Sequence, residues 1–201
     1  MMIGLGRFAA VVIAGGIAVA ALAQGGASQT SKFLKAVREE DGNTATSMLS
    51  APGSVVIDSR EVVTNITALE VIIERQDNVW LSFLAGKGAN LNLPNSKGAP
   101  PLLQAVESNF AEGVATLLRR GANVNADNRG GETPLIRAVQ RRNLALVRLL
   151  MAGGADPDRR DVLVGRSARD YARADTRMPT LLRAIEETTP APKRAVSGPK
   201  L

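Results

Sequence analysis

The sequence repeats at a period of 33 residues, and this period constrains the fold more than any other feature. Glycine-alanine pairs followed by Asn or Asp begin at residues 88, 121 and 154. A leucine column stands at 84, 117 and 150, and an aliphatic or small residue stands at 72, 105 and 138. A fourth recurring element is a three-residue segment that ends in leucine, at residues 67–69, 100–102 and 133–135. Such a period is typical of stacked copies of one small unit, since a single unit cannot bury its own apolar face.

Each copy predicts two short helices joined by a turn. In the copy at 128–158, Thr133 is suited to cap the first helix and Pro134 to occupy its first position, where a missing N–H costs nothing. Apolar residues follow at helical spacing, and a second apolar stripe precedes Gly154, which ends the second helix. The residues that we expect to be buried include Leu102, Ala105, Leu117, Leu135, Ala138, Leu149 and Leu150.

The order of these segments, T-P-L…A followed by L-L-x-x-G-A-[ND], resembles the ankyrin repeat. The best copy reads NRGGETPLIRAVQRRNLALVRLLMAGGADPD. The resemblance implies an all-α fold, an ankyrin-repeat solenoid of about five stacked helix-turn-helix units with hairpin-like loops. The clear copies span about 62–94, 95–127 and 128–161, and degenerate terminal caps span 32–61 and 162–187.

Some positions depart from the family pattern. The family usually has His after T-P-L, and this chain has Glu70, Leu103 and Ile136 there instead. The family turns between its helices on Gly, and this chain has Gln76, Asn109 and Arg142, of which Asn best tolerates a left-handed backbone. In the last unit Ser167 stands at the capping position, and Tyr171 is predicted to replace the small alanine. The loop before it carries one residue more than the period allows, so we expect it to bulge.

The amino-terminal end predicts a secretory signal peptide. Arg7 precedes an apolar run at 8–22, and the sequence Ala-Leu-Ala ends at Ala23. These three regions favour cleavage after Ala23 and a periplasmic location, with an uncleaved anchor or a buried helix as alternatives. As a helix, a run of this length reaches about 22 Å, short of the roughly 30 Å hydrocarbon core, so we expect no transmembrane segment in the mature chain. Residues 24–31 are predicted to form a short linker, and 188–201 a disordered basic tail.

The composition excludes several kinds of chemistry. Cysteine and histidine are both absent, which excludes disulfides, thiol nucleophiles and Ser-His-Asp arrangements. The closest carboxylate clusters, at 39–41 and 156–158, lack the ligand spacing of a calcium loop. We therefore expect no enzyme, no cofactor and no metal site. Aromatic residues make up 3% of the chain, too few for a single-stranded nucleic-acid platform.

Charge is unevenly distributed along the chain. Residues 24–115 carry seven Lys or Arg against ten Asp or Glu, and residues 116–187 carry fourteen against nine. The tail adds three basic residues. In the ankyrin family the hairpin tips and first helices line a concave binding surface. The resemblance places seven partner-binding candidates there, with the arginines forming a positive strip: Lys97, Gln104, Arg129, Glu132, Arg137, Arg141 and Arg160.

These features predict a monomeric, non-catalytic protein–protein interaction module, exported to the periplasm, that binds an acidic protein surface through its concave face. Nucleic acid is not an expected partner, because the protein is predicted to be exported. One alternative is an envelope-attached scaffold whose basic carboxy-terminal half and tail bind anionic lipid or cell-wall polymer. Another is an inhibitor or immunity-type protein for an acidic-faced enzyme.

Overall fold

The computed structural model describes residues 29–188, and the regular elements in that range are helices. The predicted all-α fold is therefore confirmed, whereas the predicted signal peptide and almost all of the predicted tail lie outside the described residues. Residues 29–38 form a helix, so the prediction of a linker is wrong for residues 29–31, and the rest of that predicted linker lies outside the described residues. The other elements are α2 (Gly42–Ser50), the short 3-10 helix η1 (Val56–Asp58), α3 (Ala68–Arg75), α4 (Asn78–Gly86), α5 (Pro101–Glu107), α6 (Ala111–Arg119), α7 (Pro134–Gln140), α8 (Leu144–Ala152), α9 (Ala168–Ala174) and α10 (Pro179–Thr188).

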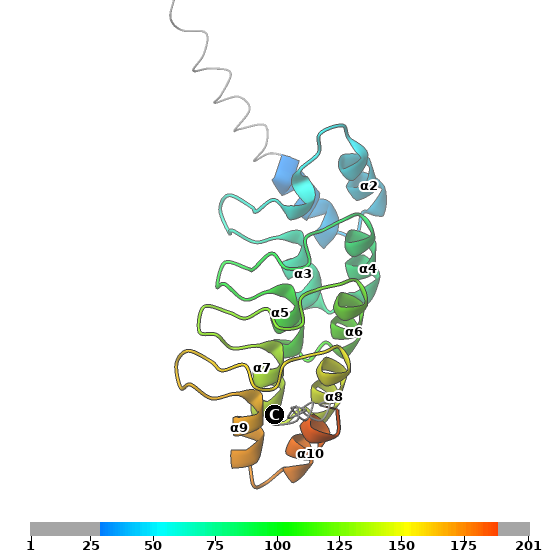
Figure 1. Cartoon of the computed structure of the whole chain (residues 1–201). Helices are drawn as coiled ribbons and strands as arrows, with labels where there is room; N and C mark the ends of the chain where they lie inside the picture. Colours follow the sequence, from blue (N-terminus) through cyan, green and yellow to red (C-terminus); the bar gives the residue numbers. More distant parts are fainter. Residues whose placement is uncertain (1–28, 189–201) are drawn as a thin grey trace, which may run out of the picture.

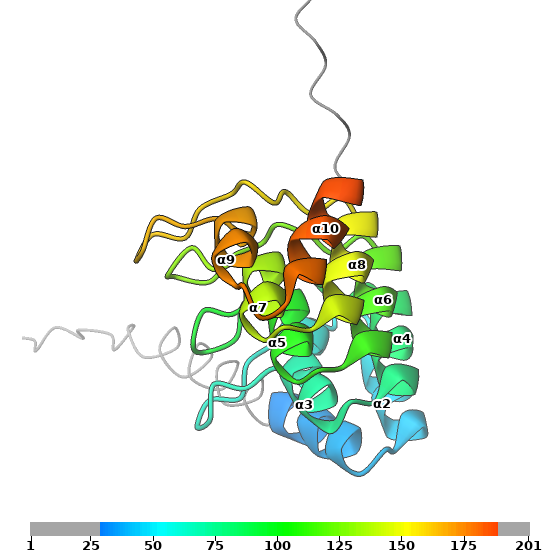
Figure 2. The ribbon, with the colours of Figure 1, turned by 90° about the horizontal axis from the view of Figure 1, so that it is seen from below.

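The helices stack in two rows. The first helices of the units, α3, α5, α7 and α9, form one row, and α2, α4, α6, α8 and α10 form the other (Figure 1). The loops between units project from the side of the first row, at an angle to the stack (Figure 2). From α3 to α10, each helix packs mainly on its partner in the same unit and on its counterparts in the adjacent units. This nearest-neighbour arrangement is that of a solenoid.

The predicted caps explain where the first helices begin. Thr133 Oγ1 accepts a hydrogen bond from the Ile136 backbone N–H at 3.2 Å, and Pro134 occupies the first position of α7. Ser167 caps α9, where the Asp170 carboxylate also returns to the Ser167 backbone N–H to complete a capping box. Each cap satisfies donors that a helix start leaves unpaired.

The turns between first and second helices use a left-handed backbone without glycine. The φ angles are +57° at Gln76, +55° at Asn109 and +53° at Arg142. The side chains of these residues reach the following unit. Gln76 Nε2 donates to the Ser108 carbonyl at 2.6 Å, and Asn109 Oδ1 accepts from the Asn143 amide at 2.6 Å. Arg142 forms an ion pair with the aspartate of the last turn, at residue 175. A side chain that links units thus explains why glycine is absent there.

The core runs continuously through the stack, with one correction to the predicted stripe of α8. Leu102, Ala105, Leu117, Leu135, Ala138 and Leu150 are buried as expected. Leu149 is only half-buried, so its predicted burial is wrong. Val147 is buried instead, because α8 turns residues 146, 147, 150 and 151 toward α6, α7 and α10.

The extra loop residue also shifts the register of the last unit. Thr133 and Ser167 are 34 residues apart, so the residue equivalent to Ala138 is Ala172, which is buried. The prediction that Tyr171 replaces this alanine is therefore wrong. Tyr171 is half-buried and directs its hydroxyl to the Asp161 carboxylate at 2.7 Å.

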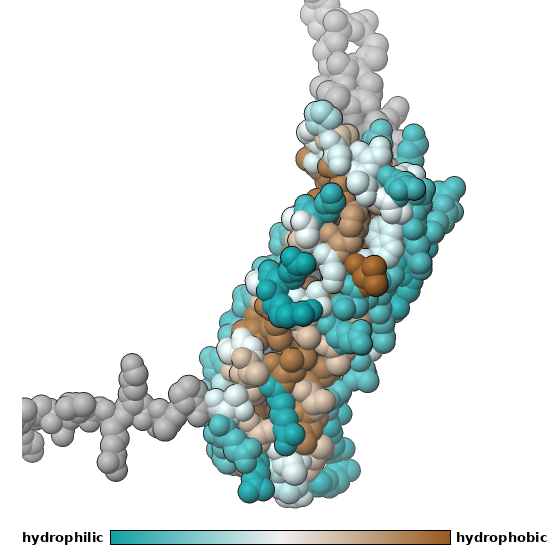
Figure 3. Space-filling model, turned by 90° about the vertical axis from the view of Figure 1, so that its right-hand side faces the viewer, coloured by the Kyte–Doolittle hydropathy of each residue, from teal (hydrophilic) through white to brown (hydrophobic). Residues whose placement is uncertain are grey.

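The face made by the second helices is partly apolar. Figure 3 shows apolar side chains gathered along it, and Val79 of α4 is largely exposed. A hollow of about 220 Å³ lies at α2 and α4, lined by Glu40, Gly42, Thr46, Val79, Trp80 and Phe83. The later second helices, α4, α6, α8 and α10, pack on one another more closely than α2 packs on α4. Within residues 29–188, no helix is long and apolar enough to cross a membrane.

Candidate functional site: the concave face

The concave face is the surface made by the first helices α3, α5, α7 and α9 and by the loops that precede them. One side chain organises each of the later three loops. Asn95 Oδ1 accepts from the backbone N–H groups of residues 97 and 99, and Asn128 Oδ1 from those of 130 and 132. Asp161 Oδ1 accepts from those of 164 and 165 in the longer last loop. Burial would raise the pKa of Asp161, but these hydrogen bonds and one from Tyr171 outweigh it and lower that pKa. The loops are therefore preset by the fold.

Three predicted residues are exposed on this face and have no carboxylate oxygen within 4 Å in the described chain. Lys97 and Arg129 lie on adjacent loops, and Arg141 follows the last residue of α7. The stem of Arg129 lies over Gly98, with its Cγ 2.9 Å from where a Cβ on that glycine would stand. Arg129 therefore holds two neighbouring loops in contact.

The predicted positive strip is not continuous, because its central arginine is paired with two carboxylates. Arg137 Nη2 lies 2.8 Å from Glu132 Oε2, and Arg137 Nε lies 3.2 Å from Glu107 Oε1. Arg160 lies 3.3 Å from a carboxylate oxygen of Asp170. Sequence reasoning missed these pairs, since Glu107 is 30 residues away from Arg137 and reaches it only across the stack.

Gln104 does not project from the face as predicted. Its side chain is 8% exposed, and its Nε2 donates to the Ala99 carbonyl at 2.8 Å. Gln104 therefore holds the loop before α5 against that helix.

The sequence reasoning also missed an acidic hollow at the other end of the face. This hollow of about 250 Å³ is lined by Glu70, Glu74, Ile73, Asn95, Lys97, Ala99, Gln104, Glu107, Ser108 and Asn128. Burial raises the pKa of Glu70, against the effect of the Thr67 backbone N–H, which lowers it. A signal was present in the sequence, since Glu70 stands in the column of Leu103 and Ile136, both fully buried.

The first helices therefore change sign along the stack, although Lys97 adds an exposed cation beside the acidic hollow. The first helices α3 and α5 present Glu74 and Glu107, and α7 presents Arg137 followed by Arg141. Glu107 and Arg137 pair with each other. Glu74 and Arg141 have no opposite charge within 4 Å in the described chain. Uncompensated charges of opposite sign thus stand on α3 and directly after α7.

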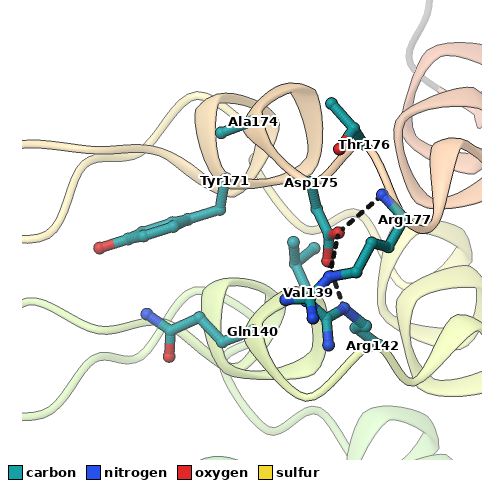
Figure 4. A pocket seen from close by; sticks show the side chains of 8 residues that line it. All are labelled: Val139, Gln140, Arg142, Tyr171, Ala174, Asp175, Thr176 and Arg177. Carbon is teal, nitrogen blue, oxygen red and sulfur yellow. Dashed lines mark hydrogen bonds and ion pairs between the residues drawn. The ribbon is translucent and has the colours of Figure 1, made fainter.

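A second hollow, of about 420 Å³, lies where α7 and α9 end, and its charges compensate one another (Figure 4). Asp175 accepts from Arg142 and also lies 3.9 Å from Arg177 Nε. The hydrogen bond from Arg142 is the main reason that the pKa of Asp175 is lowered. This hollow joins the last two units and leaves no unpaired carboxylate for a ligand.

Across residues 29–188, no cluster of three or more acidic residues is arranged to hold a metal ion. The polar surface described above therefore offers charge and hydrogen bonds, the groups with which a surface recognises another macromolecule.

Comparison with known families agrees with the geometry. Residues 69–161 match a family model described as ankyrin repeats, in three copies. The matched range begins within α3 and ends in the loop before α9, so it includes the acidic hollow and Arg141. No curated protein matches the chain.

Proposed function

The chain belongs to the ankyrin repeat family, whose domains are typically non-catalytic binding modules, and we propose that it holds a protein partner on its concave face. We propose further that it does so in the periplasm, after removal of residues 1–23. The partner contacts the first helices and their loops, and the chain itself performs no covalent chemistry.

The change of sign along the concave face carries this proposal. Glu74 and Arg141 are exposed charges without intramolecular partners in the described chain. Separated charges of opposite sign attract a surface of complementary polarity and fix its orientation. In place of the acidic surface expected from the sequence, we therefore propose a partner that presents a basic region to α3 and α5 and an acidic region to α7.

Exchanging the two charges tests the proposal. The mature chain from Gln24 and its Glu74→Lys/Arg141→Glu variant are immobilised and used to capture proteins from the periplasmic extract of the source organism. We expect at least one captured protein to bind the variant tenfold or more weakly, about 1.4 kcal/mol. The net charge is unchanged in this variant, so the loss reports where the charges stand.

A matched exchange on the opposite face is the control. Glu112 of α6 and Arg148 of α8 are both exposed on second helices, and the Glu112→Lys/Arg148→Glu variant should bind within threefold of the unaltered chain. A chain ending at Glu187 should do the same. Equal losses in both charge exchanges, or complete loss on removal of the tail, would contradict binding by the concave face.

Export is supported by the order of Arg7, the apolar run at 8–22 and Ala23. The mass of the protein recovered from the envelope fraction is the measurement. A chain that begins at Gln24 agrees with the proposal, and a chain that retains residues 8–22 contradicts it.

A second candidate function is attachment to the envelope membrane, and the last loop favours it. Val162, Leu163 and Val164 are 77%, 80% and 62% exposed in succession. Arg160 and Arg166 flank this tip, and both are exposed. Aliphatic side chains bordered by arginines suit the boundary between acyl chains and anionic headgroups.

Vesicle sedimentation tests this second candidate. Attachment predicts that the mature chain binds phosphatidylcholine vesicles containing phosphatidylglycerol, and that replacing all three residues 162–164 with serine weakens binding at least tenfold. Val79→Ser, which changes an equally exposed valine on α4, is the control and should have no effect. Binding that depends only on the tail beyond Glu187, or no binding to the anionic vesicles, contradicts a role for the loop.

A further inference from the structure

The acidic hollow lies between α3, α5 and the loops at 95–99 and 128, and the groups that form its wall are engaged within the chain, whereas Glu74 and Lys97 are exposed at its rim. Gln104 Nε2 donates to a backbone carbonyl at 2.8 Å, and Asn95 Oδ1 accepts from two backbone N–H groups. Glu107 lies 3.2 Å from Arg137 Nε. The hollow therefore has a fixed wall, which the chain maintains without a ligand.

Glu70 is the exception in this wall. Its side chain lines the hollow and is 6% exposed. Glu70 Oε2 is the single buried side-chain oxygen in the described part of the chain that has no hydrogen-bond partner. The carboxylate accepts a hydrogen bond from the Thr67 backbone N–H, which leaves Oε2 as the oxygen without a donor. A buried oxygen of this kind is costly, so it marks the position where a donor is missing.

A related carboxylate elsewhere in the chain shows which donor fits. Asp170 occupies the same third position of α9 that Glu70 occupies in α3. One oxygen of Asp170 lies 3.3 Å from Arg160, and the other lies 3.6 Å from Arg173. Asp170 in α9 is thus flanked by two guanidinium groups of the chain itself, whereas Glu70 in α3 faces the acidic hollow.

We propose that this hollow is a subsite for a basic side chain, arginine or lysine, of the protein bound on the concave face, so that it rests on the function proposed above. The cation donates to Glu70 Oε2, and Glu74 at the rim adds a second negative charge. Arginine suits this subsite best, because its planar fork donates to more than one oxygen at once.

Binding of a cation is coupled to the ionisation of Glu70. The charged groups that face it are Glu74 from the same helix, Lys97 and Arg60 from the loops and Glu107 from α5. Burial holds the pKa of Glu70 above its ordinary value, and a bound cation favours the ionised form. Affinity for the cation therefore rises with pH through the titration of Glu70, and the binding event releases a proton.

Titration with a single basic residue tests the subsite. Acetyl-arginine-amide is added to the isotopically labelled mature chain, and backbone amide shifts are followed by NMR. We expect saturable shifts around residues 70, 74, 97 and 107, and at least tenfold weaker binding to Glu70→Gln. Glu112→Gln removes the same charge from the exposed surface of α6 and should bind as the unaltered chain does. Affinity of the unaltered chain should rise from pH 4 to pH 7, and this rise should vanish in Glu70→Gln.

Three results would overturn the subsite: no saturable shifts in the unaltered chain, equal weakening by Glu112→Gln, or shifts that map elsewhere. Glu74→Gln, at an exposed position, is the second variant and should weaken binding even if Glu70→Gln disturbs the fold. Partner binding that depends on the Glu74 and Arg141 exchange but not on Glu70 removes the subsite and leaves the proposed function in place. Partner binding that depends on Glu70 but not on the exchange contradicts the orientation by Glu74 and Arg141 proposed above and keeps the subsite.

Discussion

Replacing Leu150 with alanine is expected to lower the free energy of unfolding by about 2–5 kcal/mol, the range for leucine truncations in packed cores. Leu150 is fully buried on α8, which packs on α6, α7 and α10. Few neighbours can move to fill the space, because the helices on three sides are held by their own stacking. Chemical denaturation followed by circular dichroism measures the effect.

Leu149→Ala is the matched control, since it removes the same atoms from the neighbouring, half-buried position. We expect it to cost less than about 1.5 kcal/mol, because part of that side chain already faces water. A loss at Leu149 equal to that at Leu150 would contradict the register of α8 described above.

Gly131→Ala is expected to destabilise the chain by about 2–5 kcal/mol, for two additive reasons. The φ angle of Gly131 is +73°, a conformation in which a Cβ is strained by about 1–2 kcal/mol. The added Cβ would also stand 2.9 Å from the backbone nitrogen of Val162, which donates to the Gly130 carbonyl. Two neighbouring loops must then separate, and overpacking of this kind costs about 1–3 kcal/mol.

Gly165→Ala separates the two contributions. Gly165 has the same φ of +73°, yet an added Cβ there meets no atom within 4 Å. Its substitution should cost about 1–2 kcal/mol from backbone strain alone. Thermal unfolding of both variants decides the matter, and equal losses would show that the contact between loops has no energetic role.

The fold was predictable because each repeated column has one physical task. Thr133 caps, Ala138 packs closely and Gly154 follows a helix end, and these tasks depend on near neighbours in sequence. The two errors in the core have local causes as well. Leu149 and Val147 both fit helical spacing, and only the packing of α8 on other units decides which is buried. The register of Ala172 depends on the longer loop.

The candidate site was less predictable, because charge pairing joins residues from different units. The sequence predicts that Arg137 is an exposed, unpaired cation, but stacking of the units brings Glu107 beside it. The sequence predicts that Gln104 projects from the surface, but its side-chain amide donates a hydrogen bond to the Ala99 backbone carbonyl. Glu70 alone carried a readable signal, since a carboxylate interrupts a column of apolar residues at Leu103 and Ile136.

The looser packing of α2 on α4 has a thermodynamic consequence. In a nearest-neighbour stack each interface contributes separately to the free energy, so the unit with the weakest interface opens without unfolding the others. The hollow at Val79, Trp80 and Phe83 removes contacts from that interface. Amide hydrogens of α2 are therefore expected to exchange with solvent through a low-energy local opening, and those of α6 and α8 only when a larger part of the stack opens. We expect α2 to be the first of these helices to lose its structure as heat or denaturant is applied.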